Sequence, residues 1–206
     1  MSVAFLDTET VTLDAGPDVI WEIGVITRDY GRPDTEWLYQ VRPNMAKANP
    51  KSLEIGGFHE RYQLHGRDAA YAWGPYNDGR PAKLTMPGLA LSLHVLLGGR
   101  SIFGICPSFD TLRLGLFLRR QFHNPPGYTE PWHYQPHDVE DEVAGFLAAN
   151  FLNAGVQVDP ECFAIPRPTE ALVRAIGLDP DKYAKHTAMG DCRLARDMHD
   201  VVGGPP

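Results

Sequence analysis

The chain has no long apolar run, few cysteines and no excess of basic residues. Its 206 residues include 3 cysteines, 19 lysines and arginines, and 26 aspartates and glutamates, which gives a net charge of −7. No apolar stretch approaches the ~20 residues of a membrane span, and the N-terminus lacks the basic start and apolar stretch of a secretory signal. We therefore expect a soluble, cytoplasmic protein whose mature form is the whole chain.

The cysteines argue against two kinds of small cross-linked fold. Cys106, Cys162 and Cys192 are odd in number and widely spaced. That pattern suits neither a disulfide framework nor a zinc knuckle, and it predicts buried thiols in a reducing compartment.

The acidic balance argues against a protein that coats nucleic acid by bulk electrostatics. It does not exclude an enzyme that acts on the ends of nucleic acids, because acids that bind divalent ions change the local sign of the charge. A hydrophobic content of 43% is enough for a sizeable core. With no repeats and no long linker, the sequence predicts one domain over 1–206, with a fraying tail at 203–206.

The order of the predicted elements indicates an α/β protein with a mixed sheet. Three strands come first and predict an antiparallel meander, and helices then alternate with a further strand. The predicted strands are 3–6, 19–27, 35–41 and 101–105. The predicted helices are 51–55, 89–97, 108–121, 138–153, 169–176 (with Thr169 as its cap) and 187–201.

One stretch, 62–87, resists assignment because it is rich in glycine, proline and aromatic residues. It contains Tyr71, Trp73 and Tyr76 and is long for a connection. Either it is a flap on the substrate side or it is an irregular segment packed by its own aromatics. We favour packing, because aromatic clusters in loops more often cover a core.

Two acids directly follow the first apolar run. Side chains alternate along a strand, so Asp7 and Glu9 point one way while Thr8 and Thr10 point the other. Two desolvated carboxylates on one face repel each other, and a Mg²⁺ or Mn²⁺ ion between them would remove that cost. These residues alone do not distinguish a metal site from two solvated acids in a loop.

Two later junctions carry similar groups. Asp110 lies in the first turn of the helix after the fourth strand, and His186 and Asp191 flank the start of the last helix. Five residues on a helix turn ~500°, so His186 and Asp191 can converge only if the histidine precedes the helix. Each group alone is weak evidence, since an acid in a first helical turn usually complements the helix dipole.

Taken in order, these motifs resemble those of the DEDDh, or DnaQ-like, 3′–5′ exonucleases, which have a ribonuclease H-like fold. The resemblance covers residues 3 to about 200. The residues that carry it are 5–10 (Phe-Leu-Asp-Thr-Glu-Thr), 21–24 (Trp-Glu-Ile-Gly), 108–110 (Ser-Phe-Asp) and 186–191 (His-Thr-Ala-Met-Gly-Asp). It implies a three-layer fold in which a mixed sheet, an antiparallel meander followed by parallel strands, is flanked by helices.

The resemblance also implies a mechanism. Two divalent ions, Mg²⁺ or Mn²⁺, would be held by Asp7, Glu9, Asp110 and Asp191, with Asp7 bridging both ions. Glu9 and Asp191 would complete one site, and Asp110 would support the other, partly through water. His186 would be the general base that takes a proton from the attacking water. The reaction would release nucleoside 5′-monophosphates from a 3′ end.

For the substrate, the resemblance implies contacts from four residues. Thr8 and Thr10 would lie beside the terminal nucleotide of single-stranded DNA or RNA, and Phe58 with His59 would stack on or wedge the terminal bases. The alternative places Phe58 in the core and His59 on the surface. The sequence does not separate DNA from RNA.

The chain departs from the family at two places. Ile105-Cys106-Pro107 stands where His-Asn is common, which puts substrate contacts there in doubt. Cys192 replaces a small alanine after the last acid and should fit as a small hydrophobe.

Three further possibilities concern the function, a zinc site and the partners of the protein. A catalytically silent nucleic-acid-binding or polymerase-associated domain of the same fold is the rival function. A zinc site from His123, His133, His137 and Asp138 is disfavoured, because Pro136 breaks the spacing and no thiol is near. The absence of a basic tail favours a stand-alone enzyme, or a subunit recruited by a polymerase or replication partner, and a homodimer stays open.

Overall fold

The computed structural model describes residues 2–64, 68–75, 80–155 and 157–203. Within them, one mixed sheet has the strand order β5-β4-β3-β2-β1-β6-β7. The strands are β1 Ser2–Thr10, β2 Ile20–Asp29, β3 Thr35–Val41, β4 Ala70–Trp73, β5 Ala82–Leu84, β6 Ser101–Gly104 and β7 His137–Asp138. β1 to β5 pair antiparallel, whereas β6 is parallel to β1 and β7 is parallel to β6. The predicted α/β class and the antiparallel meander followed by parallel strands are confirmed.

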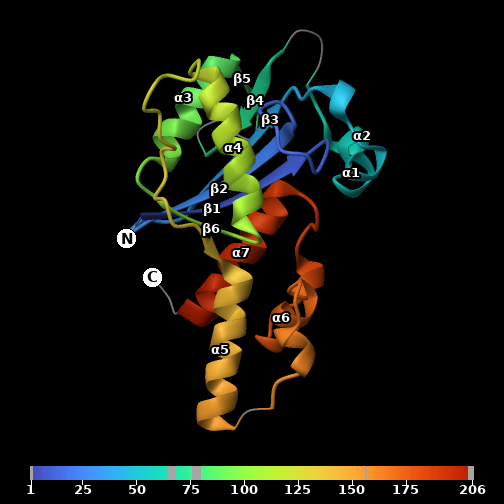
Figure 1. The fold of residues 1–206 in the computed structure, drawn as a ribbon, viewed down its shortest axis with the longest axis vertical. Helices are drawn as coiled ribbons and strands as arrows, with labels where there is room; N and C mark the ends of the chain where they lie inside the picture. Colours follow the sequence, from blue (N-terminus) through green and yellow to red (C-terminus); the bar gives the residue numbers. More distant parts are fainter. Residues whose placement is uncertain (1, 65–67, 76–79, 156, 204–206) are drawn as a thin grey trace.

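Helices cover both faces of the sheet (Figure 1). They are α1 Pro50–Ile55, α2 Phe58–Arg61, α3 Met86–Leu97, α4 Pro107–Gln121, α5 Val139–Ala154, α6 Thr169–Ala175 and α7 Ala188–Gly203, with short 3₁₀ turns at Met45–Lys47, Pro160–Phe163 and Pro180–Lys182. α3 and α4 pack on one face, and α5, α6 and α7 contribute to the core on the other. The three-layer prediction is therefore confirmed.

β1 supplies side chains to both cores because its residues alternate between the two faces. Ala4 and Leu6 belong to the core beneath α3 and α4, whereas Val3 and Phe5 belong to the core beneath α5 and α7. The strand is thus buried on both sides. Side chains at its end must point into one helical layer or the other, and this alternation separates the polar residues that follow.

Several predicted boundaries are wrong. β1 extends to Thr10, so the acids lie within the strand and not in a loop after it. Thr169 does not cap α6, because its hydroxyl donates to Glu140 Oε1 instead. Gly203, expected in a frayed tail, ends α7, while 204–206 lie outside the described residues. Cys106 is exposed, although Cys162 and Cys192 are buried as predicted.

The unassigned segment 62–87 extends the sheet. It contains β4 and β5, which pair at the edge beyond β3. Tyr71 is buried, and its ring meets that of Trp73 edge-on at 5.8 Å, which agrees with packing by the segment's own aromatics. Tyr76 lies outside the described residues. The short strands were missed because glycine and proline around them mask their alternation.

None of the helices in the described part of the chain is both long and apolar enough to cross a membrane.

Candidate active site

Three carboxylates meet where the end of β1 passes the start of α7. Asp7 and Glu9 lie on the face of β1 that α7 covers, and Asp191 lies in the first turn of α7. One oxygen from each lies within 4.8 Å of an oxygen of the other two. The sequence placed these residues in different elements, and the fold brings all three together. A group of three carboxylate oxygens suits a hard divalent cation.

Asp110 approaches from the opposite helical layer. It is in the first turn of α4 and is buried. The backbone amide and the hydroxyl of Thr8 both donate to its Oδ1, at 2.9 and 2.6 Å. Thr8 points away from Asp7 and Glu9, as the alternation of β1 predicts, so its side chain fixes the fourth acid. The other oxygen of Asp110 is not held by Thr8.

The four acids share an unfavourable environment for charge. Burial raises the pKa of Asp7 well above its usual range, and the charges of Asp110, Asp191 and Glu9 add to the effect. Burial followed by the charge of Asp191 raises the pKa of Glu9 to about 7. Burial raises the pKa of Asp110 to about 7, against the two hydrogen bonds from Thr8, and that of Asp191 to about 6. Desolvated carboxylates with mutual repulsion fit a bound divalent cation, which would reverse both effects.

His186 lies in the turn before α7 and is exposed. Its backbone is left-handed, with φ at +55°. Together with Asp7, Ile105 and Asp191 it lines a cavity of about 280 Å³. The structure therefore places the proposed base in the same cavity as two of the acids, and before the helix, as the convergence of His186 and Asp191 requires.

Two glycines allow this close approach. A Cβ on Gly24 of β2 would lie 2.5 Å from the carbonyl oxygen of Ala188, so only glycine lets the start of α7 rest on the sheet. A Cβ on Gly190 would lie 2.1 Å from the carbonyl oxygen of Ala184. The Trp-Glu-Ile-Gly motif at 21–24 thus contributes to the site by letting α7 bring Asp191 to β1.

Sequence reasoning assigned no role to Glu22 and Arg61, which lie beside the acids. Glu22 on β2 is 2% exposed and forms an ion pair with Arg61 at the end of α2. Arg61 also lowers the pKa values of Asp7, Glu9 and Asp191. A signal was available: an acid within a run of apolar strand residues needs a partner for its charge. The sequence cannot show which of 19 basic residues supplies it.

The four residues expected to contact substrate lie in different environments. Phe58 is 6% exposed and packs against Trp21 and Tyr62, at ring-centroid distances of 5.2 and 4.5 Å. This is the core position weighed as the alternative, and His59 is exposed as that alternative expected. The Thr10 hydroxyl donates to the carbonyl of Thr12 at 2.8 Å. The hydroxyl groups of Thr8 and Thr10 therefore both donate to acceptors within the protein.

The two departures from the family pattern do not disturb the acids. Cys106 is exposed and precedes α4 with φ at +53°. Cys192 is buried and its thiol lies 3.5 Å from the carbonyl oxygen of Phe5, so it fits between α7 and β1 as a small hydrophobe. Of the disfavoured zinc set, His137 stacks on Phe103 at 4.5 Å and Asp138 caps α5.

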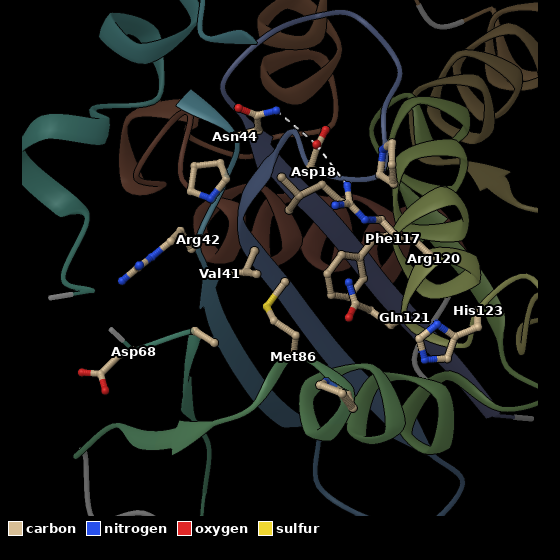
Figure 2. Close-up of a pocket in the computed structure, with 15 residues that line it drawn as sticks. Asp18, Val41, Arg42, Asn44, Asp68, Met86, Phe117, Arg120, Gln121 and His123 are labelled. Atoms are coloured by element: carbon tan, nitrogen blue, oxygen red, sulfur yellow. Dashed lines mark hydrogen bonds and ion pairs between the residues drawn. The ribbon is translucent and has the colours of Figure 1, made fainter. Parts of the chain in front are cut away.

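A second cavity, of about 690 Å³, lies between the start of α3, the end of α4 and the ends of β2 and β3 (Figure 2). Asp18 is joined there to Asn44 and Arg120, at 3.2 and 3.1 Å. None of the four acids lines this cavity, and its Asp18 and Arg120 form an ion pair with each other. It is therefore separate from the carboxylate site.

Comparisons with known proteins establish the fold. No protein-family model matches the chain, and no curated protein matches it. Among solved structures, a zinc-bound complex of E. coli exonuclease I with single-stranded DNA matches with a TM-score of 0.66 at 18% identity, covering 98% of this chain and 40% of that one. A product-bound exonuclease I matches at 0.64 and 17%, covering 98% and 43%. Exonuclease I from Methylocaldum szegediense matches at 0.60 and 17%, covering 98% and 40%.

The chain spans about 40% of the length of these structures. The matching structures are of exonuclease I, and the fold that they share with this chain agrees with the fold that the motifs predict. At sequence identities of 17–18%, the likeness shows a shared fold. The chain has the ribonuclease H-like fold of exonuclease I.

Proposed function

We propose that this protein is a metal-dependent 3′–5′ exonuclease that removes nucleoside 5′-monophosphates from single-stranded DNA. The observation that carries the proposal is the meeting of Asp7, Glu9 and Asp191 within 4.8 Å, beside Asp110 and His186. These are the five residues that the DEDDh motifs select, and they come from three separate segments. Single-stranded DNA is proposed over RNA because exonuclease I structures of the same fold hold oligodeoxynucleotides or single-stranded DNA.

The residues have distinct roles in this proposal. Asp7, Glu9 and Asp191 would hold a divalent ion, Mg²⁺ or Mn²⁺, and Asp110 would support a second. When bound, two such ions stabilise the attacking and leaving oxygens of an in-line displacement at phosphorus. The exposed imidazole of His186 accepts the proton of the attacking water. Histidine is the side chain that most often serves as a general base.

The test is shortening of 5′-labelled single-stranded DNA and RNA in the presence of Mg²⁺ or Mn²⁺, with released mononucleotides identified by chromatography. We expect DNA to be shortened from its 3′ end. Asp7→Asn should lower the rate by more than ~10²-fold, since even groups that only support metal ligands are worth 10–100-fold. Asp141→Asn, which alters an exposed acid on α5, is the matched control. A wild-type protein that shortens neither polymer would be the silent domain of the rival proposal.

His186→Ala should lower kcat by ~10²–10⁴-fold, the usual contribution of a general base. Metal-dependent DNA binding, followed by fluorescence anisotropy, should stay within a few-fold of wild type. A collapse of binding together with kcat would remove the support for a general-base role.

A further inference from the structure

Glu22 is a buried acid on the second strand with donors around it. Its carboxylate accepts from Arg61, from the amide of Ala188 at 3.1 Å and from the side chain of Gln40 at 3.3 Å. Ala188 is the first residue of α7, and an amide at that position has no partner within its own helix. Glu22 therefore fixes the start of the helix that carries Asp191.

Arg61 reaches the same turn from α2. Its guanidinium donates to Glu22, to the carbonyl of Gly56 and, at 2.8 Å, to the carbonyl of His186. It also lies 5.0 Å above the ring of Trp21. The planar fork of arginine can serve several acceptors in one fixed geometry, so this side chain joins β2, α2 and the turn before α7.

These contacts hold the chain directly on the C-terminal side of a strained residue. His186 has a left-handed backbone, a conformation that side chains other than glycine adopt rarely and that surrounding contacts must maintain. Its carbonyl is held by Arg61, and the amide two residues later is held by Glu22. We propose that Arg61 and Glu22 are positioning residues that hold the His186 turn in the geometry needed for proton transfer.

The proposal rests on the exonuclease function, and it has one rival. Arg61 also lies near Asp7, Glu9 and Asp191, where its charge could act as a counter-ion to the carboxylates. The two roles predict different effects of an Arg61 substitution when His186 is also replaced. A positioning residue acts through His186, whereas a counter-ion acts on the metal ligands whether or not the histidine is present.

A double-mutant cycle separates them. Arg61→Met should lower kcat by ~10–100-fold and leave KM and the Mn²⁺ concentration for half-activation within ~3-fold. In the His186→Ala background, the same change should lower kcat by less than ~3-fold, because the group that Arg61 positions is gone. Effects that multiply, or a large shift in the Mn²⁺ requirement, would overturn the proposal. The control is Arg119→Met on α4, which breaks an ion pair with Glu130 and should behave as wild type.

Two further variants guard against simple loss of folding. Arg61→Lys keeps the charge but not the fork, so we expect it to recover less than half of the lost kcat. Full recovery would favour the counter-ion. Arg61→Met with Glu22→Gln removes both charges of the ion pair together and keeps an acceptor for Ala188. It should fold, as judged by circular dichroism, and still show the low kcat of Arg61→Met.

Hydrogen exchange tests the same contacts without activity. The amide of Ala188 should exchange at least ~10-fold faster in Arg61→Met than in wild type or Arg119→Met, measured by mass spectrometry on peptides covering 184–190. Unchanged exchange would mean that Arg61 does not hold the turn. If wild type degrades neither DNA nor RNA, the proposed function fails, and this measurement still decides whether the turn is held.

Discussion

Thr8 makes the clearest single-residue contribution to the charge state of the site. Its amide and hydroxyl both donate to the oxygen of Asp110 that faces them. Each bond stabilises the ionised carboxylate and so opposes the rise in pKa that burial causes. Asp110 is nearly inaccessible, with 2% of its surface exposed, so water cannot replace a donor that is removed.

Thr8→Val removes the hydroxyl and keeps the shape of the side chain. Since a hydrogen bond to a charged group is worth ~1.5–3 kcal/mol, and one pKa unit corresponds to ~1.4 kcal/mol, the pKa of Asp110 should rise by about one to two units. Activity needs the ionised acid, so the acid limb of the pH–rate profile should move to higher pH by about the same amount.

The profile is measured between pH 5.5 and 9 at saturating Mn²⁺. Thr10→Val is the matched control, because its hydroxyl donates to a backbone carbonyl and not to an acid. Equal shifts in both variants would mean that the Thr8–Asp110 hydrogen bond does not determine the position of the acid limb of the pH–rate profile.

At the scale of elements, the site depends on how closely α7 approaches the sheet. Ala188 and Met189 pass over Gly24 at a distance that excludes any side chain there. Gly24→Ala should force the start of α7 outward, with an overpacking cost of ~1–3 kcal/mol. Asp191 and His186 would move with it, so activity should fall by more than ~10-fold even in the folded fraction.

Thermal melts and steady-state rates on the same samples check this prediction. Gly145→Ala is the control: it is an exposed position within α5 where a Cβ meets nothing within 4 Å. That change should be neutral or stabilise by ~0.5–1 kcal/mol. If Gly24→Ala matched it in stability and rate, the close approach of α7 would be irrelevant to the site.

Local sequence patterns predicted most helices and strands and the four acids of the site. They failed for contacts that depend on tertiary structure. β3 was predicted with the observed ends, and α4 and α7 within two residues, because their apolar periodicity is strong. The alternation of β1 correctly separated Asp7 from Thr8, but it could not show that Thr8 binds Asp110, which is 102 residues away.

The edge strands β4 and β5 and the two-residue β7 are short, and their pairing depends on neighbours that no local pattern reveals. Phe58 likewise follows a family motif expected to meet bases, yet its ring is covered by Trp21 and Tyr62. Whether an aromatic faces core or substrate depends on the packing of the whole layer.

At the scale of the molecule, the fold concentrates negative charge at one place in a chain that is already acidic. Asp7, Glu9, Asp110 and Asp191 come from both helical layers and the strand between them. Their repulsion is a cost of the folded state only, since the unfolded chain separates and hydrates them. A divalent ion would convert this cost into a stabilising interaction, so metal binding should be visible in the stability of the whole protein.

The direction in which the stability of the metal-free protein changes with pH follows from the raised pKa values of its acids. Glu9 titrates at about 7 in the folded protein and near 4.5 when unfolded, and Asp191 at about 6 against 3.8. Below pH ~4 these groups are protonated in both states and cost nothing. Between about pH 4 and 7 the folded state keeps protons that the unfolded state has already lost, so metal-free stability should fall across this range and level off above pH ~7.

Melting temperatures with EDTA and with Mn²⁺, from pH 5 to 8, test this directly. The increase caused by Mn²⁺ should be small at pH 5 and grow to several degrees at pH 8, because the ion requires the ionised carboxylates. Glu9→Gln should melt higher than wild type in EDTA at pH 8, since one repelling charge is gone, and should respond less to Mn²⁺. A response to Mn²⁺ that is the same at pH 5 and 8, or the same in Glu9→Gln and wild type, would show that the ion binds elsewhere.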